Sequence, residues 1–175
     1  MNSVLLDSDA ISRAITRISY EIIEKNKGID NIVLIGIQRR GVIMANRLSD
    51  KLYELEGKRL PVGILDITLY RDDLSMLTEH PVINGTSINF VIEGKKIVLI
   101  DDVLFTGRTV RAAIEAICEL GRPAKIELAV MIDRGHRELP FRADYVGKNV
   151  PTSRTENVNV NFSELDDGDY VSITK

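Results

Sequence analysis

Short apolar runs alternate with amphipathic stretches along most of the chain. Residues 97–100 form an unbroken apolar run, and such runs between turn residues are typical of strands buried on both faces. Beyond Thr109, apolar side chains recur at the period of one helix face as far as Leu120, and Gly121 can end that helix. This alternation predicts an α/β protein with a central, mainly parallel sheet flanked by helices. Loops at the carboxyl ends of the strands are expected to host the functional site.

Similar patterns predict the other elements. Isoleucines at helical spacing predict a first helix that starts near Asp7 or Ser8 and ends before Gly28. Further elements are expected as strand 31–35, helix 42–57, strand 62–70, strand 97–100, helix 108–120 and strand 125–132, with alternation returning at 158–162. Residues 71–93 are polar and rich in turn formers, which favours a mobile lid or a hairpin. We expect one domain over residues 1–175.

Composition points to a globular protein of the reducing cytosol. Of the 175 residues, 44% are apolar and 28% charged, and no apolar run approaches the length of a membrane span or a signal core. The single cysteine, Cys118, excludes an intrachain disulfide, and its place near an apolar helix face predicts a small core residue. His80 and His136 give no metal-ligand spacing with it, which argues against structural zinc. We expect a cytoplasmic protein.

Charge is distributed unevenly along the chain. The formal net charge of −3 argues against a protein that binds nucleic acid with its entire surface. Residues 134–154, however, contain five basic side chains against two acids, whereas five acids face one lysine from residue 156 onward. A local basic face on an acidic protein is therefore possible.

The segment that follows the apolar run at 97–100 carries candidate chemistry. Asp101 and Asp102 come directly after that run, and Thr106 and Thr109 flank the turn that opens the next helix. A strand–turn–helix leaves free N–H groups at the positive end of a helix dipole, and two hydroxyls beside them complete a phosphate cradle. The two carboxylates lie where a ribose diol or its metal would be. This is the pattern of a sugar-phosphate site, and it matches neither a Walker loop nor a dinucleotide fingerprint.

These residues resemble a known family. Residues 101–109, Asp-Asp-Val-Leu-Phe-Thr-Gly-Arg-Thr, are similar to the 5-phosphoribosyl-1-pyrophosphate (PRPP) binding motif of type I phosphoribosyltransferases. Many transferases share that motif, which implies their fold with a small hood and a mobile lid. Residues 69–74, 133–140 and 144–153 resemble, more specifically, the PyrR family of bacterial pyrimidine-operon regulators and uracil phosphoribosyltransferases. The resemblance covers nearly the whole chain.

The resemblance implies two activities. One converts uracil and PRPP to UMP and pyrophosphate, with Mg²⁺ held mainly by PRPP and possibly by Asp101 and Asp102. The other regulates pyrimidine biosynthesis by binding pyrimidine-operon leader mRNA in response to UMP or UTP, which causes transcription attenuation. A homo-oligomer is expected. The RNA-binding positions implied are Thr16, Arg17, Arg137, Arg142 and Lys148.

The same resemblance assigns the parts of the transferase site. Catalytic positions are Asp101, Asp102, Arg39 and Arg40. PRPP-binding positions are Asp101, Asp102, Phe105, Thr106, Gly107, Arg108 and Thr109. The pyrophosphate loop contains Gln38, Arg39 and Arg40, and its arginines between glycines suit pyrophosphate, because Arg donates in a planar fork and Gly lets the backbone approach. The lid contains Tyr70, Arg71, Asp72 and Asp73.

The preferred base follows from a difference within the superfamily. In the related hypoxanthine-guanine enzymes, an aspartate stands at the position of Phe105 and a lysine at that of Asp133, and both contact the purine. A purine would lose both partners here, which favours a pyrimidine. Base contacts are expected at Arg134, Tyr145, Val146 and Val158. A purine phosphoribosyltransferase without an RNA role stays open as the alternative. So does a regulator whose site is mainly a nucleotide sensor, although an intact pyrophosphate loop favours retained catalysis.

Overall fold

The computed structural model describes residues 3–68 and 85–175. Its elements are β1 (Ser3–Leu6), α1 (Ser8–Asn26), β2 (Ile32–Ile37), α2 (Arg40–Glu56), β3 (Val62–Leu65), β4 (Lys96–Leu104), α3 (Arg108–Leu120), β5 (Lys125–Asp133), β6 (Tyr145–Asn149), β7 (Asn157–Asn161) and β8 (Tyr170–Thr174). The expected lid residues Tyr70, Arg71, Asp72 and Asp73, together with His80, lie outside the described ranges.

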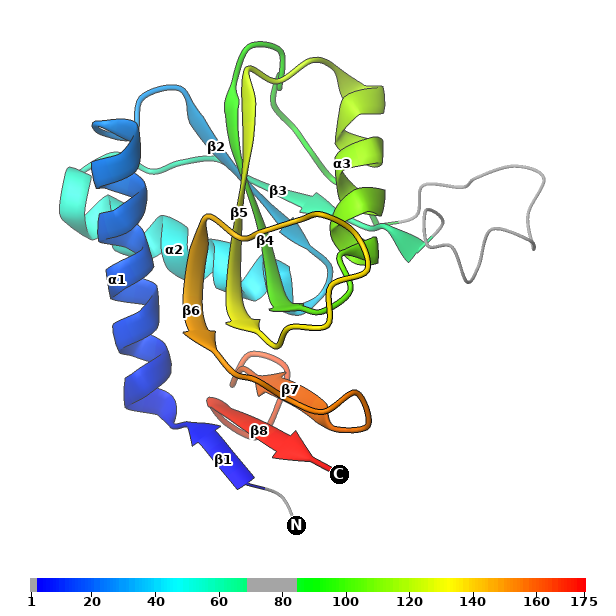
Figure 1. The fold of residues 1–175 in the computed structure, drawn as a ribbon. Helices are drawn as coiled ribbons and strands as arrows, with labels where there is room; N and C mark the ends of the chain where they lie inside the picture. The colour runs from blue at the N-terminus through cyan, green and yellow to red at the C-terminus, as the bar shows by residue number, and fades with distance from the viewer. Residues whose placement is uncertain (1–2, 69–84) are drawn as a thin grey trace.

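Five strands form a parallel sheet in the order β3-β2-β4-β5-β6 (Figure 1). Every residue of β2 is buried, as expected for an apolar strand covered on both faces. Ile35 of β2 pairs with Leu99 of β4, and Asp101 of β4 pairs with Val130 of β5. The predicted parallel α/β sheet is confirmed.

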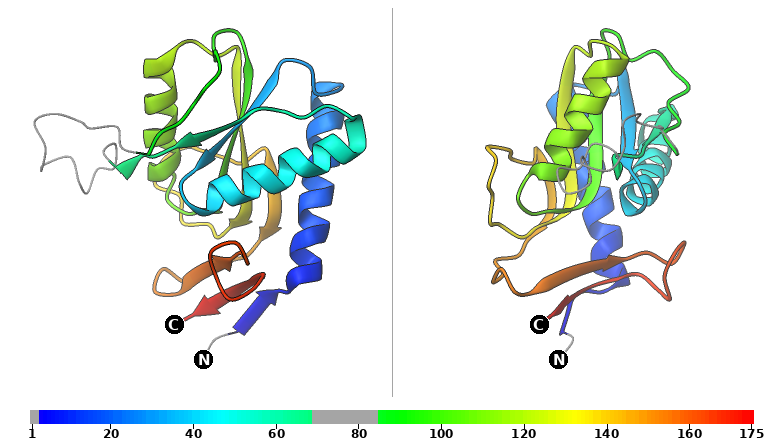
Figure 2. Two further views of the ribbon diagram at one scale, coloured as in Figure 1. Left: turned by 180° about the vertical axis from the view of Figure 1, so that it is seen from behind. Right: turned by 90° about the vertical axis from the view of Figure 1, so that its right-hand side faces the viewer.

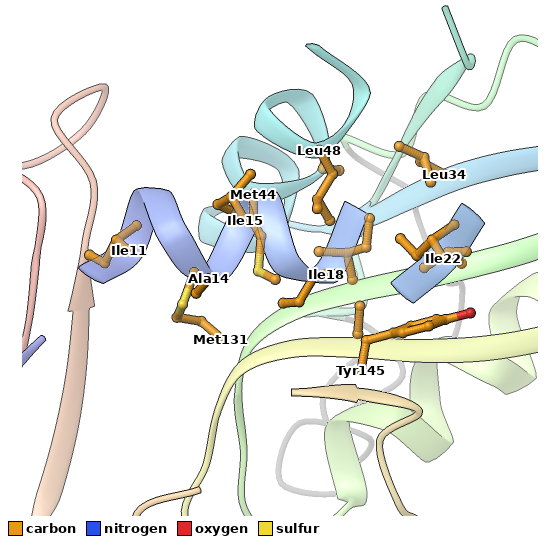
Figure 3. Close-up of a cluster of buried hydrophobic side chains, with 14 of the residues drawn as sticks. Ile11, Ala14, Ile15, Ile18, Ile22, Leu34, Met44, Leu48, Met131 and Tyr145 are labelled. Carbon is orange, nitrogen blue, oxygen red and sulfur yellow. The ribbon is translucent and has the colours of Figure 1, made fainter. Parts of the chain in front are cut away.

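Helices cover the two faces of this sheet (Figures 1 and 2). α1 and α2 pack on one face, where Ile18, Leu48 and Leu34 belong to one buried cluster (Figure 3). α3 packs on the other face, where Val110 and Ile117 join Leu99 in a second cluster. α1 begins as predicted, because the side chain of Asp7 caps it by accepting a 2.8 Å hydrogen bond from the amide of Ala10.

A second, antiparallel sheet in the order β1-β8-β7 lies beyond the carboxyl ends of β4, β5 and β6 (Figure 1). We call this sheet and its connecting loop 162–169 the hood. Arg47 of α2 holds that loop, because its guanidinium donates to Glu164 and Asp169 and stacks 4.7 Å from the ring of Phe162. Two elements distant in sequence are thereby fixed to each other.

Three sequence-based expectations need correction. β4 extends to Leu104, so Asp101 and Asp102 lie within the strand rather than after it, and the described part of the segment predicted as strand 62–70 is a strand only to Leu65. Cys118 is exposed, because it lies on the outward side of the last turn of α3. β1, β6 and β8 were not predicted.

Among residues 3–68 and 85–175, no helix is long and apolar enough to cross a membrane.

Candidate active site

Adjacent strands β2 and β4 lead to helices on opposite faces of the sheet. β2 leads to α2 on the α1 side, and β4 leads to α3 on the other. A parallel sheet opens at such a reversal, and ligands bind there, beyond the carboxyl ends of the strands. Gly41 brings the start of α2 against β4, since a Cβ on this residue would lie 2.4 Å from the carbonyl oxygen of Ile100. The two loops that the sequence singled out therefore meet at one place.

Two carboxylates stand near the end of β4. Asp101 is 8% exposed, and its Oδ1 accepts a 2.9 Å hydrogen bond from the amide of Asp102. Burial raises the pKa of Asp101 well above its ordinary value, and the adjacent charge of Asp102 adds to the effect. Asp102 is half-buried and accepts from the amide of Val103. The two carboxyl groups therefore differ. Asp101 is buried and has a raised pKa, whereas Asp102 is only half-buried.

The phosphate loop, residues 105–109, follows β4 directly. Gly107 precedes α3 with φ of 93°, a left-handed conformation that favours glycine. The Thr106 hydroxyl accepts a 3.3 Å hydrogen bond from the amide of Arg108, while Thr109 stands in the first turn of α3. The first amides of a helix lack intrahelical acceptors and attract anions. The loop has the conformation expected of a phosphate cradle, and its role in binding phosphate stays a prediction.

The expected pyrophosphate loop has two arginines in different surroundings. The Gln38–Arg39 peptide bond is cis, and the exposed side chain of Arg39 makes no hydrogen bond or ion pair within the described residues. Arg40 instead forms a two-pronged pair with Asp166 of the hood, at 2.7 and 3.3 Å. Within the described part of the chain, only Arg40 of the two arginines is bound, and its partner Asp166 belongs to the hood.

A flat cation lies on an aromatic ring at the ends of β4 and β5. The guanidinium of Arg134 lies 4.0 Å from the centroid of the Phe105 ring. Arg134 is 6% exposed, and its nitrogens donate to the Thr152 hydroxyl and to the carbonyls of Ser153 and Glu156. Burial lowers the pKa of this arginine. These contacts fix Arg134 beside the phosphate loop.

Three of the expected base contacts lie in β6 and β7. Tyr145 is 2% exposed at the start of β6, beneath α1 (Figure 3). Its hydroxyl donates a hydrogen bond to Glu127. The carbonyl of Val146 already accepts a 3.0 Å hydrogen bond from Arg17. The prediction was wrong for Tyr145, because this residue is buried beneath α1 at the start of β6. The expected base contact of backbone groups near Val146 stays a prediction. Val158 is a half-buried residue of β7 in the hood.

The expected RNA-binding positions do not form one group. Arg17 joins α1 to β6, because it donates to the carbonyls of Val146 and Gly147. Lys148 joins β6 to β1, because its Nζ lies 3.4 Å from the carbonyl oxygen of Leu5. Thr16 is half-buried and Arg142 is exposed. Arg137 points inward instead, where it donates to two carbonyls and to Asp133.

Sequence reasoning missed the partners that hold these residues. Asp133 pairs with Arg137, Asp166 pairs with Arg40, and Thr152 donates to the carbonyl of Arg134 while accepting from its side chain. Asp133 and Arg137 are four residues apart in a segment the sequence singled out, so their opposite charges were a signal. The other two pairs join distant segments, and no local spacing indicates them.

Comparison with known proteins defines the class first. The family described as "Phosphoribosyl transferase domain" matches residues 1–166. "Bifunctional protein PyrR" of Acetivibrio thermocellus is 67% identical over 170 residues, covering 97% of this chain and 92% of that protein. "Bifunctional protein PyrR" of Clostridioides difficile is 59% identical over 169 residues, covering 97% and 96%. The chain belongs to the PyrR family of phosphoribosyltransferases.

Solved structures agree on the fold. A hypoxanthine phosphoribosyltransferase from Staphylococcus aureus superposes with a TM-score of 0.74 at 22% identity, over 99% of this chain and 92% of that one. The enzyme of the same name from Trypanosoma cruzi gives 0.75 at 18% identity, over 98% and 95%. At these identities the likeness concerns the fold alone.

Proposed function

We propose that this protein transfers the phosphoribosyl group of PRPP to uracil, forming UMP and pyrophosphate, and that it also regulates pyrimidine biosynthesis by binding operon leader RNA. Residues 1–175 act as one phosphoribosyltransferase domain in this proposal. The observation that carries it is the sequence of groups at the end of β4. Two carboxylates there precede a phosphate loop, at the point where the connections of the sheet reverse direction. The PyrR relatives support the pairing of a transferase with a regulator.

The proposed reaction breaks the bond between C1′ and pyrophosphate as a base nitrogen attacks. Positive charge develops on the ribose ring, as in glycoside chemistry. The residues that act are those that hold the two ends of PRPP. The amides and hydroxyls of residues 106–109 bind the 5′-phosphate, and Asp102 binds the ribose hydroxyls. Arg39, whose guanidinium has no partner among the described residues, binds the leaving pyrophosphate, and Arg40 supports the loop through Asp166.

The donor set agrees with magnesium held mainly by substrate. Among the described residues, no three His, Cys, Asp or Glu side chains gather into a metal cage. Mg²⁺ commonly keeps several waters and binds through one or two carboxylates plus substrate phosphates. Asp101 and Asp102 would supply the carboxylates, and the ion would neutralise charge on the pyrophosphate. Because Asp101 is buried and its pKa is raised, Asp102 is the better ligand.

Uracil is proposed as the base because the space beside the phosphate loop is occupied by Phe105 and Arg134. An aspartate in place of Phe105 could accept a hydrogen bond from a purine, and the phenyl ring cannot. The carboxylate of Asp133 is taken by Arg137 and by the amide of Gly135. A purine thus finds neither partner here, and a site without matching polar groups discriminates strongly.

RNA binding is proposed for the exposed basic side chains of Arg17, Lys148 and Arg142. Lys and Arg side chains contact phosphates and release counterions, so such binding weakens with salt. UMP or UTP acts as the effector, and a homo-oligomer presents more than one such set of side chains. Of these residues, Arg142 makes no hydrogen bond or ion pair with the described part of the chain. It is therefore the residue on which the proposed RNA contact is most directly tested.

Gel-shift titration with pyrimidine-operon leader RNA tests the regulatory activity. Arg142→Ala is expected to weaken binding, added salt to weaken it further, and UMP to tighten it, because an effector must bind better to the RNA-competent state. Arg17→Ala is a second variant, although it also removes the bonds to Val146 and Gly147. No binding at low salt, or binding indifferent to UMP and to Arg142, leaves only the transferase. A nucleobase panel with PRPP and Mg²⁺ tests that transferase separately.

A further inference from the structure

Residues 133–141 lie directly behind the phosphate loop and are bonded to its backbone. The carbonyl oxygen of Thr106 accepts from the amides of Glu138 and Leu139, at 2.9 and 3.0 Å. One residue before the loop, the carbonyl of Leu104 accepts from the amide of Arg134 at 3.1 Å. The position of the loop therefore depends on that of the segment.

One side chain joins the two. Arg137 donates from Nη1 to the carbonyl of Phe105 at 2.6 Å, from Nε to the carbonyl of Phe141 at 3.0 Å, and from Nη2 to Asp133 at 2.6 Å. Its side chain is 23% exposed and that of Asp133 is 14% exposed. The guanidinium thus connects the first residue of the loop to both ends of segment 133–141.

Packing makes the loop sensitive to this connection. A Cβ on Gly107 would lie 3.0 Å from the ring of Phe141 and 3.4 Å from Cβ of Leu139. Phe141 therefore closes off the back of the residue that turns the chain into α3. Because Arg137 holds the carbonyl of Phe141, its loss frees the ring that supports Gly107.

We propose that Arg137 is a positioning residue for the 5′-phosphate site and not a contact for RNA. Its planar guanidinium donates to two carbonyls and one carboxylate, and a lysine could not reproduce these three hydrogen bonds. Removing Arg137 leaves Asp133 with the amide of Gly135 but without its guanidinium partner. The carbonyls of Phe105 and Phe141 also lose the donor that Arg137 supplies. The inference rests on the proposed function, since it assigns the residue to PRPP binding there.

The expected kinetic effect falls on KM. The 5′-phosphate is remote from the reacting C1′ and is bound alike in the ground state and the transition state, so weakening its site raises KM with kcat little changed. For Arg137→Gln we expect the KM for PRPP to rise about tenfold, the size of effect for losing roughly 1.4 kcal/mol of binding. The kcat at saturating PRPP should change by less than about threefold.

The test compares Arg137→Gln with Arg122→Gln. Arg122 is exposed, its side chain has no partner among the described residues, and it follows the far end of α3, so it controls for loss of one charge. Circular dichroism establishes folding, and calorimetry with PRPP and Mg²⁺ supplies dissociation constants. A higher KM and weaker PRPP binding in Arg137→Gln alone support the proposal. Values within twofold of the wild type overturn it. If Arg137→Gln does not fold, Asp133→Asn is judged by the same criteria.

RNA titration separates positioning from direct contact. The slope of log K against log salt is negative. Removing a residue that contacts an RNA phosphate makes this slope less steep by about 0.7–0.9. The slope should become less steep in Arg142→Gln and should keep its wild-type value in Arg137→Gln. A less steep slope in Arg137→Gln overturns the proposal. Wild-type protein that binds no PRPP refutes the proposed function itself, which distinguishes the two failures.

Discussion

Arg134 and Phe105, at the ends of neighbouring strands β5 and β4, form a cation–π pair at 4.0 Å. Three further acceptors hold the guanidinium, and the ring of His136 meets the ring of Phe105 edge-on at 5.8 Å. By the resemblance to the hypoxanthine-guanine enzymes, Phe105 stands at the position of their aspartate. We propose that this stack forms a flat, rigid wall for a small base and determines the base preference of the site.

Replacing Arg134 by lysine tests that wall. Lysine keeps the charge but loses the planar fork and most of the stacking. We expect the KM for uracil to rise several-fold, while the KM for PRPP changes less, because the phosphate loop keeps its own bonds to Glu138 and Leu139. Steady-state kinetics with each substrate varied in turn measures both constants. Equal increases in the two would mean that Arg134 supports the whole site and not the base.

Asp102→Asn and Thr109→Ala test the phosphate and ribose assignments. Each removes a hydrogen-bonding group from the proposed PRPP site, and a hydrogen bond to a charged group contributes about 1–3 kcal/mol. The expected result is a fall of about tenfold or more in kcat/KM at limiting PRPP, with thermal unfolding close to that of the wild type. Wild-type kinetics at limiting PRPP in both variants would show the cradle to be misassigned.

The sequence predicted the parallel sheet because its central strands are apolar on both faces. The runs at 32–37 and 97–100 are buried throughout, and nothing outside them was needed to recognise them. β1, β6 and β8 were missed because they are short and mix polar with apolar residues. In addition, β1 pairs only with β8, at the other end of the chain.

For the site, the local motif was sufficient to predict the turn at residues 106–109 that opens α3. It was insufficient where partners are distant. Arg40 and Asp166 are 126 positions apart. The sequence predicted Arg40 as a pyrophosphate ligand, whereas the structure shows it paired with the hood. Tyr145 was misplaced for the same reason, because its neighbour Asn26 comes from α1. Arg137 was assigned by resemblance to RNA, whereas its contacts turn it toward the phosphate loop.

The hood should loosen in acid through Asp169. Hydrogen bonds from Arg47 lower the pKa of Asp169 from 3.8 to about 2, in a pair whose side chains are 17% and 20% exposed. A depressed pKa contributes stability that is present above the unfolded value and is lost as pH falls through the folded value. The contribution, about 2 kcal/mol, should therefore disappear between about pH 4 and pH 2.

Urea unfolding of Asp169→Asn and the wild type at several pH values checks this. The two free energies of unfolding should differ near neutral pH and converge toward pH 2. Asp50→Asn is the matched control, since its partner Arg59 and Asp50 itself are both largely exposed, and exposed pairs contribute little. A difference that is independent of pH would exclude the Arg47–Asp169 pair as its source.

The central claim is a pyrimidine phosphoribosyltransferase built on a fold shared with purine enzymes. The most direct measurement is nucleotide formation by the purified protein with PRPP and Mg²⁺, given uracil, hypoxanthine or guanine in separate reactions. Because Phe105 and the engaged carboxylate of Asp133 leave a purine without partners, we predict UMP and pyrophosphate from uracil and no comparable product from either purine. Turnover of hypoxanthine or guanine equal to or faster than that of uracil would contradict the account.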